Sequence, residues 1–186
     1  MRGDRLPAYS GPSRLSTDVR PVPIGHFANA LTRALLASDG STTLLLQALT
    51  GGPITASLRS LAHQPATHLP ADLRAQLRLA DGATAIVRHS HLLDQQGTPV
   101  SRNEVIASSE DALLRSVASD PTRPVGLGLI AHDIDHSRRL YVTGLTRWDA
   151  ELDAASKAYL ISVGATPFMY VWETYNPEVI PPGTTA

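Results

Sequence analysis

The sequence contains no cysteine, which excludes disulfide bonds, thiolate metal sites and a cysteine nucleophile. Lysine is almost absent as well: Lys157 is the only one, so arginine carries the rest of the positive charge. The net charge of −1 implies no strong attraction to nucleic acid or to an anionic membrane surface. No apolar run approaches the length of a membrane span, and the N-terminus lacks the apolar core of a secretory signal. We therefore expect a cytoplasmic enzyme or binding domain.

The length of 186 residues and the hydrophobic content of 42% suit one domain with a substantial core. Residues 1–25 are rich in Arg, Pro, Ser and Gly and lack hydrophobic periodicity, a pattern typical of a flexible tail. We expect one domain over residues 26–178, followed by a C-terminal tail over residues 179–186.

The spacing of apolar residues predicts several short helices and six strands. The order of these elements contains two hairpins and no repeating βα alternation, which predicts an α+β fold. We expect a single, largely antiparallel six-stranded sheet flanked by short helices. The predicted helices cover residues 27–37, 42–49, a short segment after Pro70, a segment after residues 108–111, and 125–132. The predicted strands are 54–61, the two arms of a hairpin within 84–107, 139–147, 157–163 and 167–175.

The hairpin within residues 84–107 carries two charges on strands that are otherwise half buried. Arg88 shares a strand face with Ile86 and Leu92, because side chains alternate with period two. An arginine on an apolar face is costly unless an anion meets it. Glu104 would lie directly opposite Arg88 if the turn spans five residues, and diagonal to it if the turn spans four. A cross-strand ion pair and a bound carboxylate both fit this spacing.

Glu173 lies in the most apolar strand of the chain and shares a face with Met169, Val171 and Tyr175. A buried carboxylate there needs a cation or hydrogen bonds to stay charged. Such a group would hold a hydroxyl or handle a proton. The alternative is a solvated position at the end of the strand.

Two predicted helix starts offer backbone N–H groups to an anion. Gly126 and Gly128 lie near one of them, and N–H groups there suit a carboxylate. The third glycine and the preceding strand of a dinucleotide site are missing. The second start, residues 39–43, fits a plain N-cap better than an anion site when it is considered alone.

Seven histidines raise the question of a metal site. His132 and His136 are four residues apart, and His89 and His91 alternate along one strand face. Neither pair has a glutamate in the zinc-protease arrangement. No serine lies in a nucleophile elbow and no phosphate loop is present. We expect neither a metal nor another cofactor.

Five segments between Leu31 and Pro177 occur in an order that resembles chorismate pyruvate-lyases, which form 4-hydroxybenzoate and pyruvate from chorismate. No single segment is diagnostic, but the ordered set is moderately specific. The resemblance implies a six-stranded antiparallel sheet flanked by helices, in agreement with the count above. The segments are LLASDGSTTLLLQAL, IVRHSHLL, GTPVSRNEVIA, RPVGLGLIA and TPFMYVWETY.

The resemblance also implies roles for individual residues. Arg88 matches the arginine that binds the carboxylate, and Glu173 matches the glutamate that meets the ring hydroxyl. Asn103 and Glu104 stand where the enteric ubiquinone-pathway branch has glycine and arginine. With a glutamate at this position, the chain looks closer to the branch known from mycobacterial phenolic-lipid synthesis. The candidate catalytic residues are Arg88, Glu173 and Glu104, and the candidate binding residues are Thr42, Thr43, Arg88, Asn103, Val125, Gly126 and Glu173.

The function that the resemblance implies is a cofactor-free lyase for chorismate, a small dicarboxylate, with no nucleic-acid or membrane partner. Loss of the C4 hydrogen and the enolpyruvyl group makes the ring aromatic, so the site mainly has to hold a reactive conformer in a dry pocket. One alternative is a diverged enzyme of secondary metabolism with the same fold and another substrate.

The other alternative is a non-catalytic small-molecule-binding module, because the sensing domain of GntR-type repressors resembles the same fold. Such a repressor normally carries a winged helix upstream. Residues 1–24 are shorter and richer in proline than a winged helix.

Overall fold

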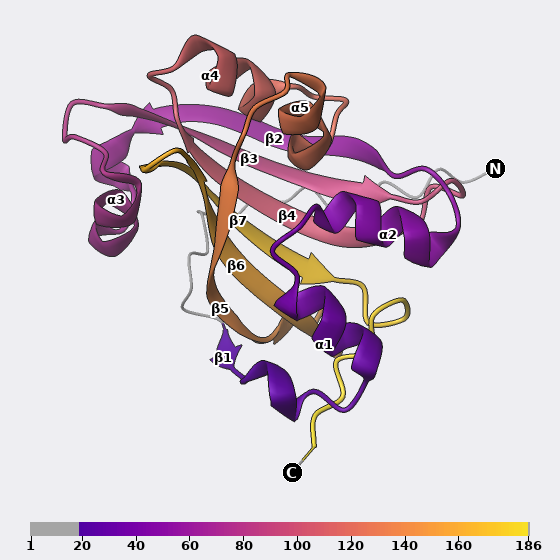
Figure 1. Ribbon diagram of the computed structural model, residues 1–186. Coiled ribbons are helices and arrows are strands. Elements are labelled where there is room, and N and C mark those ends of the chain that lie inside the picture. The colour runs from indigo at the N-terminus through magenta and orange to yellow at the C-terminus, as the bar shows by residue number, and fades with distance from the viewer. Residues whose placement is uncertain (1–18, 186) are drawn as a thin grey trace.

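A computed structural model describes residues 19–185 (Figure 1). One antiparallel sheet of seven strands forms its centre, in the spatial order β1-β5-β6-β7-β4-β3-β2. The sheet is strongly twisted, so that β5 crosses β2 at a steep angle in Figure 1. The strands are β1 (Arg20–Pro21), β2 (Thr55–Pro65), β3 (Thr84–Leu93), β4 (Pro99–Ser108), β5 (Ser137–Arg147), β6 (Asp153–Val163) and β7 (Thr166–Tyr175).

The helices are short, and local capping residues define several of their ends. The side chain of Asn29 accepts the N–H groups of the first turn of α1, and Ser41 accepts the N–H of Leu44 in α2. Gly51 ends α2 with a φ of 70°, a left-handed conformation that suits glycine. The α-helices are α1 (Ala30–Ala37), α2 (Thr42–Thr50), α3 (Ala71–Leu77), α4 (Ala112–Ser119) and α5 (Val125–Ala131), and the 3-10 helices are η1 (Ile24–His26) and η2 (Ala66–His68).

The predicted α+β fold with a large antiparallel sheet is confirmed, and all six predicted strands are present. The seventh strand, β1, has only two residues and comes from the segment predicted to be a flexible tail. The rest of that segment, residues 1–18, lies outside the described residues. At the other end of the chain, Ile180 is fully buried and Thr184 forms a bridge with Phe27. Residues from both ends of the described range therefore contact the rest of the structure.

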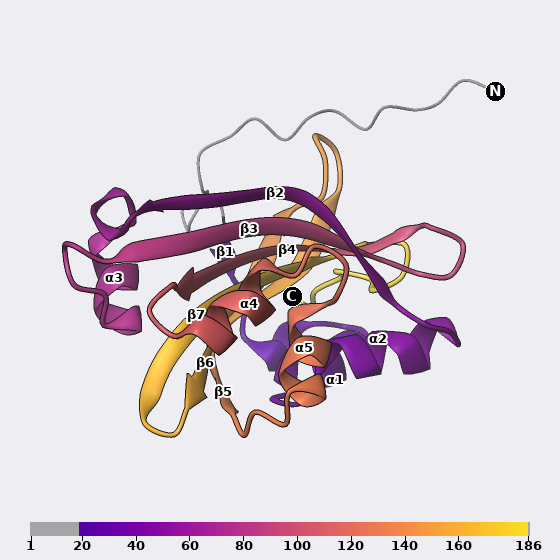
Figure 2. The ribbon, with the colours of Figure 1, turned by 90° about the horizontal axis from the view of Figure 1, so that it is seen from above.

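The helices α1, α2, α4 and α5 lie along one face of the sheet, which we call the helix face (Figures 1 and 2). On this face α1 and α2 cover one apolar cluster, which includes Leu35, Leu46 and Leu92. A second apolar cluster lies under α4 and α5. The opposite face carries a smaller cluster, in which Leu73 and Leu77 of α3 pack against strand residues. The α3 helix covers only this part of the opposite face.

The β3–β4 hairpin corrects the expected pairing of Arg88 with Glu104. The turn spans five residues, 94–98, which alone would set these two residues opposite each other. An extra residue in β4 shifts the register by one, so Arg88 lies opposite Val105 and Glu104 lies opposite His89. A shift of one residue exchanges the two faces of a strand. Arg88 therefore points to the helix face and Glu104 to the opposite face, which excludes the cross-strand ion pair, one of the two alternatives that the sequence left open.

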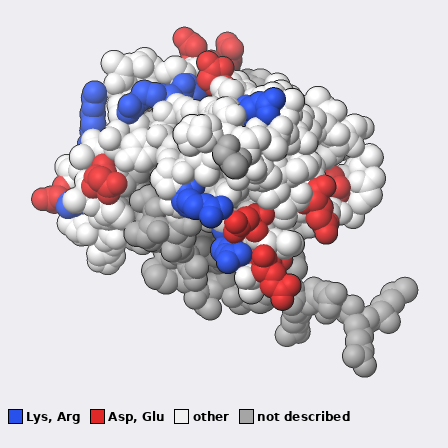
Figure 3. All heavy atoms as spheres, turned by 90° about the horizontal axis from the view of Figure 1, so that it is seen from below, with Lys and Arg blue, Asp and Glu red and all other residues white. Residues whose placement is uncertain are grey.

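Charged side chains are dispersed over the surface in view in Figure 3. Acidic and basic side chains form small separate groups there, and neither sign builds a continuous area on the described atoms of that face. None of the helices within residues 19–185 is both long and apolar enough to cross a membrane.

Gly144 of β5 supports a first prediction, because β1 approaches its backbone closely. A Cβ atom at this position would overlap the carbonyl oxygen of Arg20 and the side chain of Val19. Gly144→Ala should therefore lower the free energy of unfolding by about 1–3 kcal/mol. Urea denaturation measures this change, with Gly82→Ala as the control, since a Cβ at Gly82 meets open space. Equal losses for the two variants would contradict the packing of β1 on Gly144.

Candidate functional site

A small cavity on the helix face collects most of the predicted site residues, and we call it the inner cavity. It lies between the two apolar clusters and encloses about 30 Å³, roughly the volume of one water molecule in the liquid. Leu92 belongs to one cluster and Val105 to the other, and both line the cavity. The predicted site residues that line it are Thr42, Thr43, Asn103, Val125, Gly126 and Glu173.

Glu173 forms one end of the inner cavity and is buried, with 5% of its surface exposed. Its Oε2 atom accepts hydrogen bonds from the hydroxyls of Tyr175 at 2.6 Å and Thr42 at 3.0 Å. Its Oε1 atom accepts from the Tyr159 hydroxyl at 3.0 Å. Burial and the Glu173 charge raise the pKa of both tyrosines well above the ordinary value, so both hydroxyls remain donors at neutral pH. The solvated alternative for Glu173 is therefore excluded.

Lys157 lies beside this carboxylate, with Nζ 4.0 Å from Oε2 of Glu173. The only lysine of the chain is 1% exposed. Its ammonium group donates to the carbonyl oxygens of Leu35 at 2.9 Å and Ser38 at 3.1 Å, at the end of α1. Burial lowers the pKa of Lys157, and the charge of Glu173 opposes this shift. The pair thus ties β6 and β7 to the C-terminal end of α1.

The starts of α2 and α5 give their end of the inner cavity the character of an anion site, and Thr42 there also donates to Glu173. Thr42, Thr43 and Val125 open α2 and α5, and the N–H groups of a first helical turn have no acceptor within the helix. Arg138 lines the cavity beside them. It donates from Nη1 to the carbonyl oxygen of Asp39 at 3.5 Å, and its buried Nε atom has no hydrogen-bond partner within the described structure. Positive partial charges and one guanidinium therefore converge at this end.

Arg88, the predicted carboxylate anchor, does not line the inner cavity. Its side chain is 1% exposed and reaches the connection between α4 and α5. It donates from Nη2 to the carbonyl oxygen of Arg123 at 3.0 Å and from Nη1 to that of Ala118 at 3.5 Å. Burial lowers the pKa of Arg88, and the charge of Asp120 opposes the shift. In this structure Arg88 braces the connection between the two helices.

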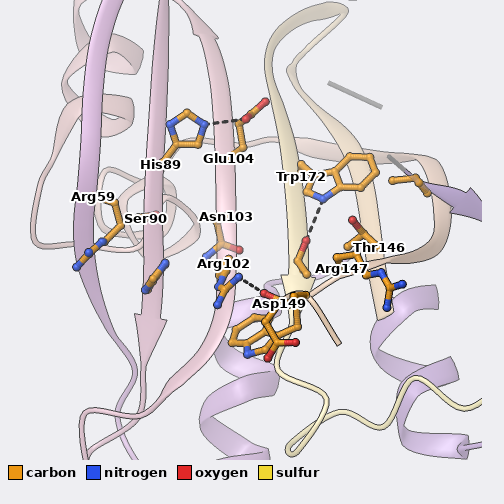
Figure 4. Close-up of a pocket in the computed structure, with 15 residues that line it drawn as sticks. Arg59, His89, Ser90, Arg102, Asn103, Glu104, Thr146, Arg147, Asp149 and Trp172 are labelled. Carbon is orange, nitrogen blue, oxygen red and sulfur yellow. Dashed lines mark hydrogen bonds and ion pairs between the residues drawn. The ribbon is translucent and has the colours of Figure 1, made fainter. Parts of the chain in front are cut away.

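Glu104 is separated from the other predicted residues because it lies on the opposite face of the sheet. Its Oε2 atom is 2.7 Å from Nε2 of His89, whose Nδ1 atom is 2.9 Å from the hydroxyl of Ser60 (Figure 4). Both Glu104 and His89 line a much larger hollow of about 700 Å³, which we call the outer cavity. Asn103, in the strand between the two cavities, contributes to both.

The histidines do not form a metal site within residues 19–185, where no group of three or more potential ligands comes together. His89 is engaged with Glu104 and Ser60. His136 donates from Nδ1 to the carbonyl oxygen of Ile134.

Sequence reasoning missed Arg138 and the full set of groups around Glu173. Tyr159 can be recognised only from the strand register. It lies two residues after Lys157 in β6, so both side chains point to the helix face. The sequence gives one signal for Lys157, because it is the only lysine in the chain. The sequence gives no signal for Arg138, because Arg139 follows it directly and only the fold decides which of the two arginines points to the inner cavity.

Comparisons with known proteins support the fold. The sequence matches no protein-family model and no curated protein. The structure is similar to PhnF from Mycobacterium smegmatis, with a TM-score of 0.59 and 14% identity over 77% of this chain and 67% of that one. The effector domain of the same PhnF gives a TM-score of 0.58 and 13% identity, with 75% and 90% of the two chains covered.

A third similar structure is the C-terminal domain of the histidine utilization repressor from Pseudomonas syringae pv. tomato str. DC3000. Its TM-score is 0.52 at 11% identity, with 68% of this chain and 93% of that one covered. The chain therefore has the chorismate lyase-like α+β fold, which is also found in C-terminal domains of transcriptional regulators. Identities this low define the fold alone.

The buried pair of Lys157 and Glu173 supports a second prediction. Lys157→Met leaves the carboxylate without its cation, and breaking a buried pair typically costs about 3–5 kcal/mol of unfolding free energy. The double variant Lys157→Met with Glu173→Gln should recover part of that loss, because no unpaired charge remains. Urea denaturation of the four proteins of this cycle gives the coupling energy. Additive losses would show that the two groups do not interact.

His91 in the outer cavity supports a third prediction. Burial and the charges of Arg102 and Arg59 lower the pKa of His91 from about 6.5 to about 4. The unfolded chain therefore binds more protons than the folded chain between these values, and stability falls as the pH drops from about 6.5 towards about 4. NMR titration of the His91 ring should give the low value, and His91→Gln should weaken the pH dependence of stability. A titration midpoint near 6.5 would contradict the assignment.

Proposed function

We propose that this chain binds a small organic acid in the inner cavity. Its anionic group would lie at the start of α2 beside Arg138, and a hydroxyl or other hydrogen-bond donor would face Glu173. The observation that carries the proposal is the mixed lining of the cavity, which combines Arg138 and two helix starts with the buried carboxylate of Glu173. The fold likeness to an effector domain supports a binding role as well.

The physical reasons for this orientation are electrostatic. A carboxylate at a helix N-terminus accepts from free N–H groups and is favoured by the helix dipole. The partnerless Nε of Arg138 gives an incoming carboxylate a further donor. The carboxylate of Glu173 would repel a second anion and accept from a neutral hydroxyl. A flat acid with a hydroxyl across its ring, such as 4-hydroxybenzoate, satisfies both requirements.

The size of the inner cavity implies that binding is coupled to opening. A volume of about 30 Å³ is far below that of an aromatic acid, so residues that line the cavity have to move to admit one. A protein whose competent state is a minor population binds more weakly and more slowly than its contacts suggest. This requirement suits a domain that converts binding into a change of shape.

The contacts around the matched family residues favour binding over catalysis. Both oxygens of Glu173 already accept hydrogen bonds, and three donors hold the carboxylate in place. The guanidinium of Arg88 is directed to backbone carbonyls rather than to the cavity. Neither the Glu173 carboxylate nor the Arg88 guanidinium can form new hydrogen bonds to a reacting substrate unless its present hydrogen bonds break.

The second candidate is the chorismate pyruvate-lyase reaction. One observation favours it: Thr42, Val125 and Glu173, which match family positions at the two ends of the ring, line the same cavity. The products would be 4-hydroxybenzoate and pyruvate. Opening of the cavity would also have to release Arg88 towards the substrate for this reaction to proceed by the family pattern.

Calorimetric titration with 4-hydroxybenzoate and its neutral amide, 4-hydroxybenzamide, tests the proposal. The acid should bind more tightly than the amide, because only the acid carries the anion. Arg138→Gln should weaken binding of the acid about 10-fold, the effect of losing one hydrogen bond to a charged group. Arg139→Gln is the matched control, since the adjacent Arg139 does not line the cavity and is expected to leave affinity unchanged.

Incubation with chorismate, followed by chromatography of the products, separates the two candidates. Binding without formation of 4-hydroxybenzoate supports the binding module, and turnover supports the lyase. If neither 4-hydroxybenzoate, benzoate nor chorismate binds at millimolar concentration, the assignment of the inner cavity is wrong. Equal affinities of the Arg138→Gln and Arg139→Gln variants would contradict the proposed anion end.

A further inference from the structure

The outer cavity has a volume of about 700 Å³, and the function proposed above does not use it. We propose that it is a second ligand site, which takes a flat aromatic molecule carrying one anionic group. The proposal rests on the side chains of the outer cavity alone and is independent of the inner cavity.

The position of the outer cavity follows from incomplete coverage of the sheet. On the face opposite the helix face, α3 packs over Val87, Ile106 and Leu160. Further along the same face the strands carry no such apolar cluster. Their side chains are instead cationic, aromatic and polar, and they surround a hollow of about 700 Å³ (Figure 4). This volume lies within the range of small-molecule sites.

Three arginines line the outer cavity, Arg59, Arg102 and Arg147, and the last of them pairs with Asp153. Arg59 occupies the bulge of β2, where the register with β3 shifts between Leu58 and Ser60. Bulges redirect side chains and are frequent beside functional sites. The guanidinium of Arg59 has no hydrogen-bond or ion-pair partner within residues 19–185. Arg102 lies over the ring of Trp148 at 4.0 Å and donates to the Trp148 carbonyl oxygen, so its position is fixed.

Two acidic groups, Glu104 and Asp149, also line the outer cavity, and each has partners of its own among the described residues. Glu104 is engaged with His89 at 2.7 Å. Asp149 uses one carboxylate oxygen to accept the N–H groups of Glu151 at 2.9 Å and Leu152 at 2.8 Å, and these bonds lower its pKa. The lowered pKa of His91 reflects in part the positive potential of Arg102 and Arg59. An anion is the ligand that this potential favours.

The aromatic side chains of the outer cavity favour a flat ligand. The chain has two tryptophans, Trp148 and Trp172, and both line the outer cavity. Trp172 is held in place by a hydrogen bond from its indole Nε1 to the hydroxyl of Thr174 at 3.1 Å. Indole and guanidinium faces both stack on flat rings, and the neutral imidazole of His91 adds a further planar group. A flat aromatic anion meets the stacking surfaces and the arginines at once.

The placement of both tryptophans gives a selective measurement, since the two indole N–H signals in an NMR spectrum both report on this cavity. 2-Naphthoate serves as the anionic ligand and 2-naphthalenemethanol as its neutral analogue. Added 2-naphthoate should shift both indole signals saturably, and the neutral analogue should bind more weakly. Arg59→Gln should weaken the binding of 2-naphthoate about 5- to 10-fold. Trp148→Ala should weaken it as well, and Trp148→Phe should restore most of the affinity.

Arg139→Gln and Arg138→Gln are the controls, because neither residue lines the outer cavity, and both should leave the affinity for 2-naphthoate unchanged. The Arg138→Gln variant also separates this site from the inner cavity. Linear, non-saturating shifts of the indole signals would overturn the proposal. So would equal affinities of wild type and Arg59→Gln, or equal affinities for the acid and the alcohol.

Discussion

The buried carboxylate of Glu173 is the constraint around which the helix face is built. A charge at this depth requires partners, and they come from separate elements: a hydroxyl from α2, tyrosines from β6 and β7, and the ammonium of Lys157. Because Lys157 in turn holds the end of α1, one charged group fixes both N-terminal helices against the sheet. The polar gap between the two apolar clusters exists because these groups cannot be replaced by close apolar packing.

Much of the fold was predictable because its signals are local. Ser41 before α2, Gly51 after it and the alternation along β7 each depend on residues a few positions apart. The register of the β3–β4 hairpin was not predictable, because a single extra residue in β4 reverses the faces of Arg88 and Glu104 and leaves no mark in the composition. The two-residue strand β1 is too short to produce a pattern.

The candidate site was predictable in part for a similar reason. The starts of α2 and α5 and the strand that carries Glu173 all line the inner cavity, and these segments have recognisable capping or strand patterns. Arg138 and Arg139 are adjacent and chemically identical, and only the pairing of β5 with its neighbours distinguishes them. The outer cavity was missed because it forms where side chains of five strands and the loop after β5 meet, and none of those segments shows the hollow by itself.

The burial of Lys157 also affects how the chain can be labelled. With its only lysine enclosed, the folded chain presents no side-chain amine to solvent. Acylating reagents would modify this side chain only after the packing of α1 on the sheet has opened. The rate of that modification would therefore report how often the α1 end of the domain separates from its core, without any introduced label.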